Sequence, residues 1–428
     1  MEKIVKPEIT TKFPIGFWNY CPLDCMGPEA VKDWADAGMT LAMSPGFDPA
    51  IHKVGDMIKV LDAAHEKGIR VILADTRGYS WMNVNFDQYR AGFLQAIKDF
   101  GSHPAVFGFH VGDEPTADNF EKACQAVKIQ VEEAPHLTPF LNFIPFVDNL
   151  KKDPGIPCIG YYGYADYLDA FVKRSKTKLL SYDCYAQMLP LPDCFEGHDG
   201  WEMYFNNLKE YQAASKRHGI PMWVTQLSTG HFSFRCPTEN DFRWQLNTAV
   251  AHGAKGIMWF FFYMRKPHAN FRIAPIDEHW ERTETFEWLS RTNRTFLKWH
   301  ASIVENLELI KVYHIGRSWA GFPSSLQDST LIHYAGSTTP LILSEFKDQN
   351  GRDYVAVVNN SQTDSTNAKV AFKGIKPSVW RVDWGGEEVD GVVDPYLCLK
   401  SGQDFATVKA WLAPGQMELY RIESDSDE

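Results

Sequence analysis

Between residue 13 and about residue 300, short apolar runs alternate with longer segments in which apolar residues recur every three or four positions. Short apolar runs bounded by Gly, Pro or Asp are typical of buried parallel strands, and the longer pattern is typical of amphipathic helices. The expected strands cover residues 13–20, 40–45, 69–74, 106–112, 140–144, 179–185, 221–226 and 256–263. The expected helices cover residues 28–37, 54–67, 86–100, 120–133, 164–174, 201–216, 241–252 and 284–304. Eight strand–helix units with short connections predict the α/β class and a (β/α)8 TIM barrel.

Beyond about residue 310 the pattern changes to apolar and polar residues that alternate with a period of two. Strands are expected at residues 340–346, 354–359, 378–383 and 415–421, and Asn350-Gly351 between the first two is a strong hairpin signal. This pattern predicts a small C-terminal antiparallel β-sandwich. We therefore expect three parts: a catalytic barrel at 1–308, the β-sandwich at 309–422, and an acidic, disordered tail at 423–428.

Length and charge restrict the function classes. A chain of 428 residues suits a barrel with one smaller module, and a hydrophobic content of 44% supports a large core. The net charge of −11 argues against nucleic acid or an anionic membrane as the main partner, because both reward Lys and Arg. No apolar run approaches the roughly 18 residues that a spanning helix needs.

The N-terminal residues lack the apolar segment of a signal peptide. The protein is therefore expected to be cytoplasmic as given, or secreted or periplasmic if a leader has been removed. The eight cysteines are scattered, without His or Cys clusters at metal-ligand spacing. We expect free thiols, no structural metal and no cofactor, and the sequence leaves the oligomeric state open.

The fourth expected strand ends in two adjacent carboxylates, Asp113 and Glu114, followed at once by Pro115. A strand that carries acids to its C-terminal end delivers them to the face where barrel enzymes hold their chemistry. A surface turn is the plainer alternative, since Asp, Glu and Pro are all common there. The 14 Trp residues fit carbohydrate stacking, although Trp also fills protein cores.

The order of these features resembles the clan A glycoside hydrolases, a superfamily of retaining enzymes, over residues 13–300. The resemblance implies that Glu114 is the acid/base residue and that Asp113 stands where the family has an Asn that holds the sugar 2-hydroxyl. It implies further that Tyr185 is the tyrosine after the sixth strand and that Trp259, on the eighth strand, forms the floor of a sugar subsite.

The seventh strand departs from the family pattern, because Gln226 occupies the position of the nucleophilic Glu. An amide is a poor nucleophile and carries no charge to stabilise an oxocarbenium ion. Four explanations are open. Gln226 replaces a catalytic Glu as an inactivating substitution; another group acts instead, such as Asp183 or an N-acetyl group of the substrate; the protein is a silent sugar-binding homologue; or the seventh strand is misplaced.

Further residues near strand ends are candidates for substrate binding. They are Trp18, Asn19, Arg77, Trp81, His110 and Asp183. Arg77 either clamps a substrate anion or pairs with Asp75 or Glu114. Period-two alternation puts His110 on the same face as Glu114, where it either lines the sugar site or is a hydrogen-bonded core histidine. For Trp18, the alternative to sugar contact is a place in a packed barrel layer.

The sequence thus predicts a retaining hydrolase of β-linked glycosides, oligosaccharides or polysaccharides, with Glu114 as acid/base and position 226 as the nucleophile site. A silent carbohydrate-binding barrel and a substrate-assisted glycosidase are the alternatives. A metal-dependent barrel hydrolase is a distant third, since it would need ligands at several strand ends and only His110, Asp113 and Asp183 are available.

Overall fold

The structure, a computed structural model, describes residues 13–146, 163–188, 200–264, 271–374, 378–391 and 406–423. The chain divides into two compact units. One contains residues 14–237 and 254–290, and the other contains residues 238–253 and 291–428 together with the N-terminal residues. The predicted domain boundary after residue 308 stays a prediction. Of the predicted acidic tail, only Glu423 lies within the described residues.

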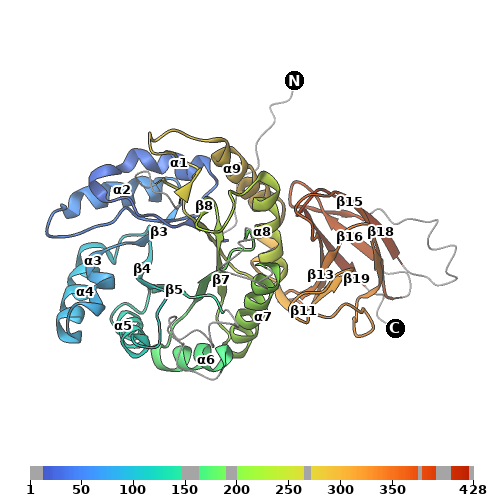
Figure 1. Cartoon of the computed structure of the whole chain (residues 1–428), viewed down its shortest axis with the longest axis horizontal. Coiled ribbons are helices and arrows are strands. Elements are labelled where there is room, and N and C mark those ends of the chain that lie inside the picture. The colour runs from blue at the N-terminus through green and yellow to red at the C-terminus, as the bar shows by residue number, and fades with distance from the viewer. Residues whose placement is uncertain are drawn as a thin grey trace. The chain divides into compact units, whose positions relative to one another are not determined.

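Within the described residues, eight parallel strands form one sheet whose strand order follows the chain (Figure 1). They are β1 (Ile15–Phe17), β2 (Leu41–Met43), β3 (Arg70–Leu73), β4 (Val106–Asp113), β5 (Phe140–Phe143), β6 (Leu180–Asp183), β7 (Met222–Leu227) and β9 (Ile257–Phe260). β1 pairs with β9 through Ile15 and Ile257, and the backbone N–H of Thr40 donates to Ile15 O at 3.0 Å just before β2. The ring of strands is thereby joined on both sides of β1, and the predicted TIM barrel is confirmed.

Helices follow the strands, and helices α1 to α7 lie around the strands in Figure 1. The longer ones are α1 (Val31–Asp36), α2 (Val54–Glu66), α4 (Phe86–Phe100), α5 (Phe120–Glu133), α6 (Tyr164–Ser175), α7 (Gly200–His218), α8 (Glu239–Ala251) and α9 (Glu284–Phe296). α9 continues through a π-helical turn, η5 (Leu297–Ala301), into α10 (Ser302–Val304). None of the described helices is long and apolar enough to cross a membrane.

Local sequence signals set several helix ends. α4 begins in a capping box, in which the Asn85 side chain accepts from the backbone N–H of Gln88 while the Gln88 side chain accepts from that of Asn85. Thr238 and Asp241 form the same motif at the start of α8. α2 is followed by Gly68, whose φ of +69° is costly for any residue with a Cβ. These helices consequently match the ranges expected from sequence within one or two residues.

The interior of the ring is filled with apolar side chains rather than solvent. Trp18, Met43, Ile72, Phe140 and Met258, from five strands or the residues just after them, belong to one buried cluster. Trp223 and Leu227 of β7 join the same cluster, so the odd-numbered positions of β7 face inward. This packed layer fixes the strands whose ends carry the polar residues described below.

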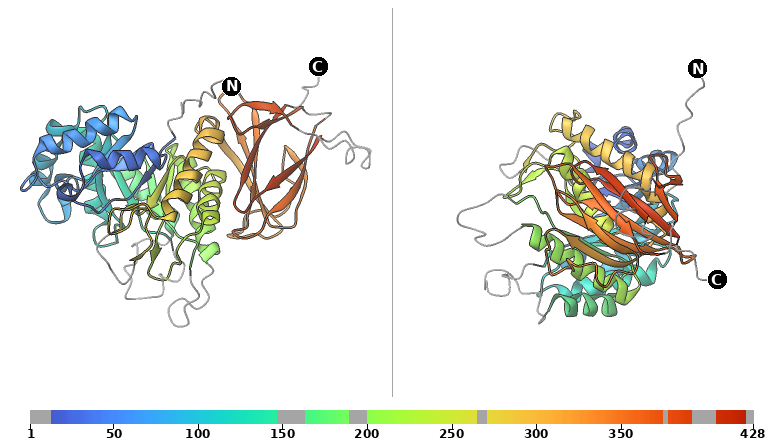
Figure 2. Two further views of the ribbon diagram at one scale, coloured as in Figure 1. Left: turned by 90° about the horizontal axis from the view of Figure 1, so that it is seen from above. Right: turned by 90° about the vertical axis from the view of Figure 1, so that its right-hand side faces the viewer.

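In the C-terminal part, two antiparallel sheets pack on a shared core (Figure 2). The six-stranded sheet has the order β11 (Glu308–Ile315), β13 (Leu341–Lys347), β14 (Asp353–Asn359), β19 (Met417–Glu423), β16 (Ser378–Val382), β17 (Glu388–Asp390). The three-stranded sheet contains β12 (Ile332–Gly336), β15 (Thr366–Phe372) and β18 (Ala406–Leu412). The expected hairpin at Asn350-Gly351 joins β13 and β14, and the predicted β-sandwich is confirmed. Sequence analysis missed β11, β12, β15, β17 and β18.

Helix α8 belongs to the same compact unit as the sandwich. The Trp244 indole N–H donates to Asn360 Oδ1 at 2.8 Å, and Asn247 Nδ2 donates to Gly415 O at 2.8 Å. At Gly415 a Cβ would lie 2.5 Å from the Trp244 backbone, so only glycine permits this approach. Helix α8 therefore packs with residues of the sandwich that are distant in sequence.

Candidate active site

The C-terminal ends of β4, β5, β6 and β7 carry polar side chains at matching heights. Asp113 pairs in register with Asn142, and Asp183 pairs with Thr225. Ser181, two residues before Asp183, is the register partner of Asn142 on β6. Because adjacent parallel strands end at the same edge, their register alone brings these side chains together.

β4 is irregular immediately before its acidic pair. Its pairing with β5 shifts between His110 and Gly112, and the Trp81 indole N–H donates to Val111 O at 2.7 Å within this irregular segment. Glu114 then adopts a left-handed φ of +44°, with its backbone N–H donating to Asn142 O at 2.8 Å. Such a conformation is unfavourable for a residue with a Cβ, and the bond to β5 holds it in place.

This irregularity corrects the expectation that His110 and Glu114 share a face by simple alternation. Asp113 takes the inward position, in register with Asn142, and Glu114 follows it on a turned backbone. His110 packs inside the barrel against aromatic rings, 5.2 Å from Trp18 and 6.2 Å from Phe140 between centroids. Burial lowers the pKa of His110 to about 4, so it is neutral at physiological pH.

Asn142 lies at the centre of the site. Its Nδ2 donates to Asp183 Oδ1 at 2.7 Å and to Asp113 Oδ1 at 3.1 Å. Its Oδ1 accepts from the hydroxyls of Thr225, at 3.2 Å, and Ser181, at 3.5 Å. One amide thus joins four strands and holds two aspartates on a single nitrogen.

Asp113, Glu114 and Asp183 form a group that we call the carboxyl cluster. Burial raises the pKa of Asp113 to about 6, and burial together with the charge of Asp113 raises that of Glu114 to about 7. Burial, then the charges of Glu114 and Asp113, raises the pKa of Asp183 well above its ordinary value. Asp113 and Glu114 are nevertheless exposed to solvent, and Asp183 is partly exposed. The cluster is therefore reachable from solution while densely surrounded by protein.

Glu114 and Asp183 lie close enough for the two carboxyl groups to act on each other: the charge of Glu114 raises the pKa of Asp183, and Asp183 as a donor lowers that of Glu114 against the effect of burial. Two carboxyl groups coupled in this way hold one proton between them over a range of pH and titrate as a pair. A protonated acid next to a carboxylate at neutral pH is the arrangement that general acid catalysis combined with a nucleophile requires. Within the described chain, no group of three or more His, Cys, Asp or Glu is arranged to hold a metal ion.

Tyr185 lies next to the carboxyl cluster. Burial raises its pKa well above the ordinary value, and the negative charges of Asp183 and Asp113 raise it further. Its ring packs edge-on against Phe234, with centroids 5.2 Å apart, in the segment that follows β7. The hydroxyl is consequently a neutral donor and acceptor close to the acids.

Gln226 is placed differently from the prediction. It is fully buried, and its Nε2 donates to the hydroxyl of Tyr204 on α7 at 3.1 Å. Its neighbour Thr225 is the residue that reaches inward to Asn142. The side chain of Gln226 therefore lies on the helix side of β7, away from the carboxyl cluster, which does not suit the nucleophile position expected from the resemblance.

Trp259 is placed on the outer face as well. It is fully buried and pairs in register with Gln226, while Met258 and Phe260 on either side belong to the interior cluster. Trp259 was expected to form the floor of a sugar subsite inside the barrel. Because side chains alternate along β9, its neighbours Met258 and Phe260 face the interior and Trp259 faces the other way. Trp18 lies in the interior cluster, 4% exposed, as a packed barrel layer requires.

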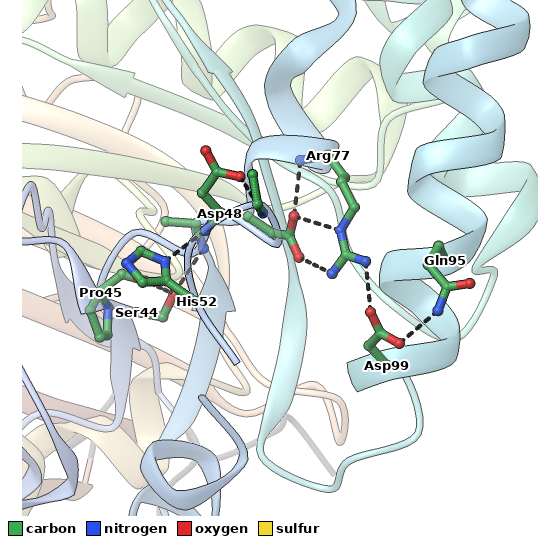
Figure 3. Close-up of polar contacts among 10 residues, drawn as sticks. Ser44, Pro45, Asp48, His52, Arg77, Gln95 and Asp99 are labelled. Carbon is green, nitrogen blue, oxygen red and sulfur yellow. Dashed lines mark hydrogen bonds and ion pairs between the residues drawn. The ribbon is translucent and has the colours of Figure 1, made fainter. Parts of the chain in front are cut away.

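Arg77 follows β3 on the short helix α3 (Thr76–Tyr79), and its guanidinium bonds two acids (Figure 3). Its Nη2 lies 2.7 Å from Asp75 Oδ2 and its Nη1 lies 2.6 Å from Asp99 Oδ2. Of the alternatives for Arg77, pairing with Asp75 is the one present.

Asn19 is buried, with its Oδ1 accepting from the backbone N–H of Cys21 at 2.9 Å. Trp81 is buried and braces β4, as described above.

Sequence reasoning missed Asn142, Ser181 and Thr225. Each is a polar residue inside an otherwise apolar strand, near its C-terminal end. Buried polar residues are uncommon unless they are hydrogen-bonded, so polar positions at corresponding places in three consecutive strands were the available signal.

The sequence matches no protein-family model and no curated protein. In fold the chain is similar to Gan42B, a family 42 β-galactosidase from G. stearothermophilus solved as a catalytic mutant, with a TM-score of 0.60 and 10% identity over 97% of this chain and 99% of that chain. A glycoside hydrolase of family 5 from Bacteroides vulgatus matches with a TM-score of 0.59 and 10% identity over 97% and 90%.

A β-galactosidase from Rahnella sp. R3 matches with a TM-score of 0.52 and 15% identity, over 72% of this chain and 59% of that chain. The match to a β-galactosidase from Marinomonas ef1 likewise spans 59% of that chain. The resemblance to clan A glycoside hydrolases is thus confirmed at the level of the fold.

Proposed function

We propose that this protein is a glycoside hydrolase that cleaves β-linked glycosides or oligosaccharides with retention of configuration. Glu114 is the acid/base residue, and Asp183 takes the nucleophile role that the sequence resemblance assigned to position 226. The observation that carries this proposal is the pair of interacting carboxyl groups, Glu114 and Asp183, at the ends of β4 and β6 on either side of Asn142. The fold shared with the family 42 β-galactosidase Gan42B, over 97% of this chain and 99% of that chain, supports β-linked substrates.

In the first step, Asp183 attacks the anomeric carbon while Glu114 gives its proton to the departing glycosidic oxygen. The bond to the aglycone breaks, and an ester forms between the sugar and the Asp183 carboxylate. In the second step, Glu114 takes a proton from water, whose oxygen attacks the same carbon and releases Asp183. Glu114 ends protonated and Asp183 ionised, so the cycle closes without any other reactant.

Retention follows from the spacing of the two acids. Inverting enzymes place their carboxyl groups about 6.5–9.5 Å apart to hold a water between them, and retaining enzymes use about 5–5.5 Å. Glu114 and Asp183 are close enough for the charge of Glu114 to raise the pKa of Asp183. We propose the shorter, retaining spacing for this pair.

Asp113 and Tyr185 are the nearest groups for binding sugar hydroxyls. Asp113 is exposed and has one oxygen bonded to Asn142, which leaves its other oxygen to accept a hydroxyl proton. The neutral Tyr185 hydroxyl can donate or accept close to Asp183. Both remain proposals, as do sugar contacts by His110, Trp18, Asn19, Arg77 and Trp81.

The test is a panel of aryl β-glycosides and β-linked oligosaccharides offered to the protein, to the Asp183→Asn variant and to the Gln226→Met variant. We expect turnover by the protein, with the β-anomer as the first product in a proton NMR time course. Loss of at least about a thousandfold in Asp183→Asn, with Gln226→Met active, supports Asp183. No turnover on any substrate combined with sugar binding would favour the silent carbohydrate-binding barrel.

A further inference from the structure

The side chain of Asn142 uses its full hydrogen-bonding capacity. A primary amide has two N–H donors and two carbonyl lone pairs. Here both donors go to Asp113 and Asp183, and both lone pairs accept from Ser181 and Thr225. Asn142 is only 3% exposed, so water cannot substitute freely for any of these partners.

The two hydroxyls determine which way the amide points. If the amide were turned over, Oδ1 would meet the two aspartates and Nδ2 would meet the hydroxyls, whose own protons would then need acceptors. In the described part of the chain, neither the Ser181 nor the Thr225 hydroxyl has another hydrogen-bond partner, and both residues are buried. A buried donor without an acceptor is costly, so the observed orientation is the favoured one.

We propose that Thr225 and Ser181 are positioning residues: by donating to Asn142 Oδ1 they keep Asn142 Nδ2 directed at Asp183, where it favours the ionised form of the Asp183 carboxyl group. Thr225, with the shorter bond, contributes more than Ser181. The consequence for catalysis rests on the function proposed above. The effect on the protonation of Asp183 does not depend on that function and can be measured separately.

Asp183 needs such a donor because none of the groups that act on it among the described residues carries a positive charge. In that part of the chain, the groups that interact with it electrostatically are Asp113, Glu114, Tyr164, Tyr182, Cys184 and Tyr185. Burial raises the pKa of the three tyrosines and of the Cys184 thiol, so all four are neutral at physiological pH. The two carboxyl groups oppose ionisation of Asp183, and Asn142 Nδ2 favours it.

The experiment uses the full chain with 13C at the carboxyl carbons of Asp and Glu, titrated by NMR between pH 3 and pH 9. The Asp183→Asn and Glu114→Gln variants assign the two signals. The test variant is Thr225→Val with Ser181→Ala, which removes both hydroxyls at nearly constant volume. Thr225→Ser keeps the hydroxyl, and Thr177→Val is the control, because the hydroxyl of this buried threonine donates to Leu179 O instead.

In the double variant we expect the midpoint of the Asp183 signal to rise by about one pH unit, a tenfold change in the proton distribution. The acidic limb of the kcat/KM profile should move to higher pH by the same amount, while KM at the optimum changes less than about twofold. Thr225→Ser should titrate like the parent protein, and so should Thr177→Val.

An unchanged Asp183 midpoint in the double variant, or an equal shift in Thr177→Val, would overturn the proposal. The two proposals fail separately. If the midpoint shifts but no glycoside is turned over, the positioning role stands and the hydrolase function falls. If Asp183 is the nucleophile of an active enzyme and neither the midpoint nor the acidic limb moves, the hydrolase stands and the positioning role falls.

Discussion

Glu114 and Asp183 act on each other's pKa although their strands, β4 and β6, are not neighbours in the sheet. β5 lies between them, and its Asn142 bonds Asp183 through the side chain and Glu114 through the backbone carbonyl. The register shift of β4 and the left-handed conformation of Glu114 both lie where β4 ends beside β5. The acid pair therefore depends on β5 as much as on the two strands that carry it.

Replacement of Asp183 and replacement of Glu114 should affect different parts of the reaction. Asp183→Asn should lower kcat/KM by at least about a thousandfold on every substrate, because no covalent bond to the sugar can form. Glu114→Gln should lose about 10²–10⁴-fold on oligosaccharides and far less on dinitrophenyl glycosides, whose leaving group needs no proton. Kinetics on both substrate types measure this contrast. Equal losses on both in Glu114→Gln would argue against Glu114 as the general acid.

Gln226→Glu should not create or increase activity. The side chain lies between β7 and α7 against Tyr204, and a charge at this position would be fully buried. We expect a destabilisation of about 2–4 kcal/mol, measured by chemical denaturation, because the transfer of a charge from water to a buried position is costly. Gln226→Met is the matched uncharged control. A gain of a hundredfold or more in activity in Gln226→Glu would restore the nucleophile position expected from the sequence.

The carboxyl cluster should make the barrel more stable at mildly acidic pH. The pKa values of Asp113 and Glu114 are raised to about 6 and about 7, and that of Asp183 is raised as well, so each favours the protonated form in the folded state. Their contribution is full below about pH 4 and is lost as the pH rises through 6 to 7. We expect Asp183→Asn to raise Tm by about 1–2 °C at pH 8, which corresponds to a stabilisation on the order of 1 kcal/mol.

The same Asp183→Asn comparison at pH 4.5 should show a much smaller gain, because the parent cluster is then largely protonated. Differential scanning calorimetry at the two pH values measures both gains. Equal gains at pH 4.5 and pH 8 would show that the stabilisation does not come from ionisation.

A buried histidine pair should act in the opposite direction in the other compact unit. His252 Nε2 and His314 Nε2 lie 3.0 Å apart, and burial lowers their pKa values to about 4 and about 2. Histidines held neutral contribute stability above the unfolded pKa of about 6.5, and this contribution is lost as the pH falls through their folded values. Tm should therefore fall below pH 6, and His314→Gln should flatten that dependence. The same dependence of Tm on pH in His314→Gln and in the parent protein would contradict this.

The barrel and the acidic pair followed from sequence because both depend on short-range patterns. Apolar runs of the right length and helix caps such as Asn85 and Thr238 mark the elements, and Asp113-Glu114 stands directly at a strand end. The side-chain roles depend on strand parity, which a difference of one residue reverses. Thr225 rather than Gln226 faces inward, and Met258 and Phe260 rather than Trp259 do so.

Asn142 was not predictable in the same way. In Phe-Leu-Asn-Phe it is one polar residue in an apolar strand, and its four partners come from β4, β6 and β7. The shift in β4 register after His110 also leaves no mark in the residue pattern. Both features arise from contacts between strands, so they appear only once the strands are assembled.

The most direct test of the central claim is the identity of the residue that becomes glycosylated. The protein is incubated with 2-deoxy-2-fluoro aryl β-glycosides of several sugars, which slow the second displacement, and is then digested and mapped by mass spectrometry. We predict one sugar per chain, attached to Asp183, and no attachment in Asp183→Asn. A sugar attached to another residue, or turnover with inversion and no attachment, would contradict the account.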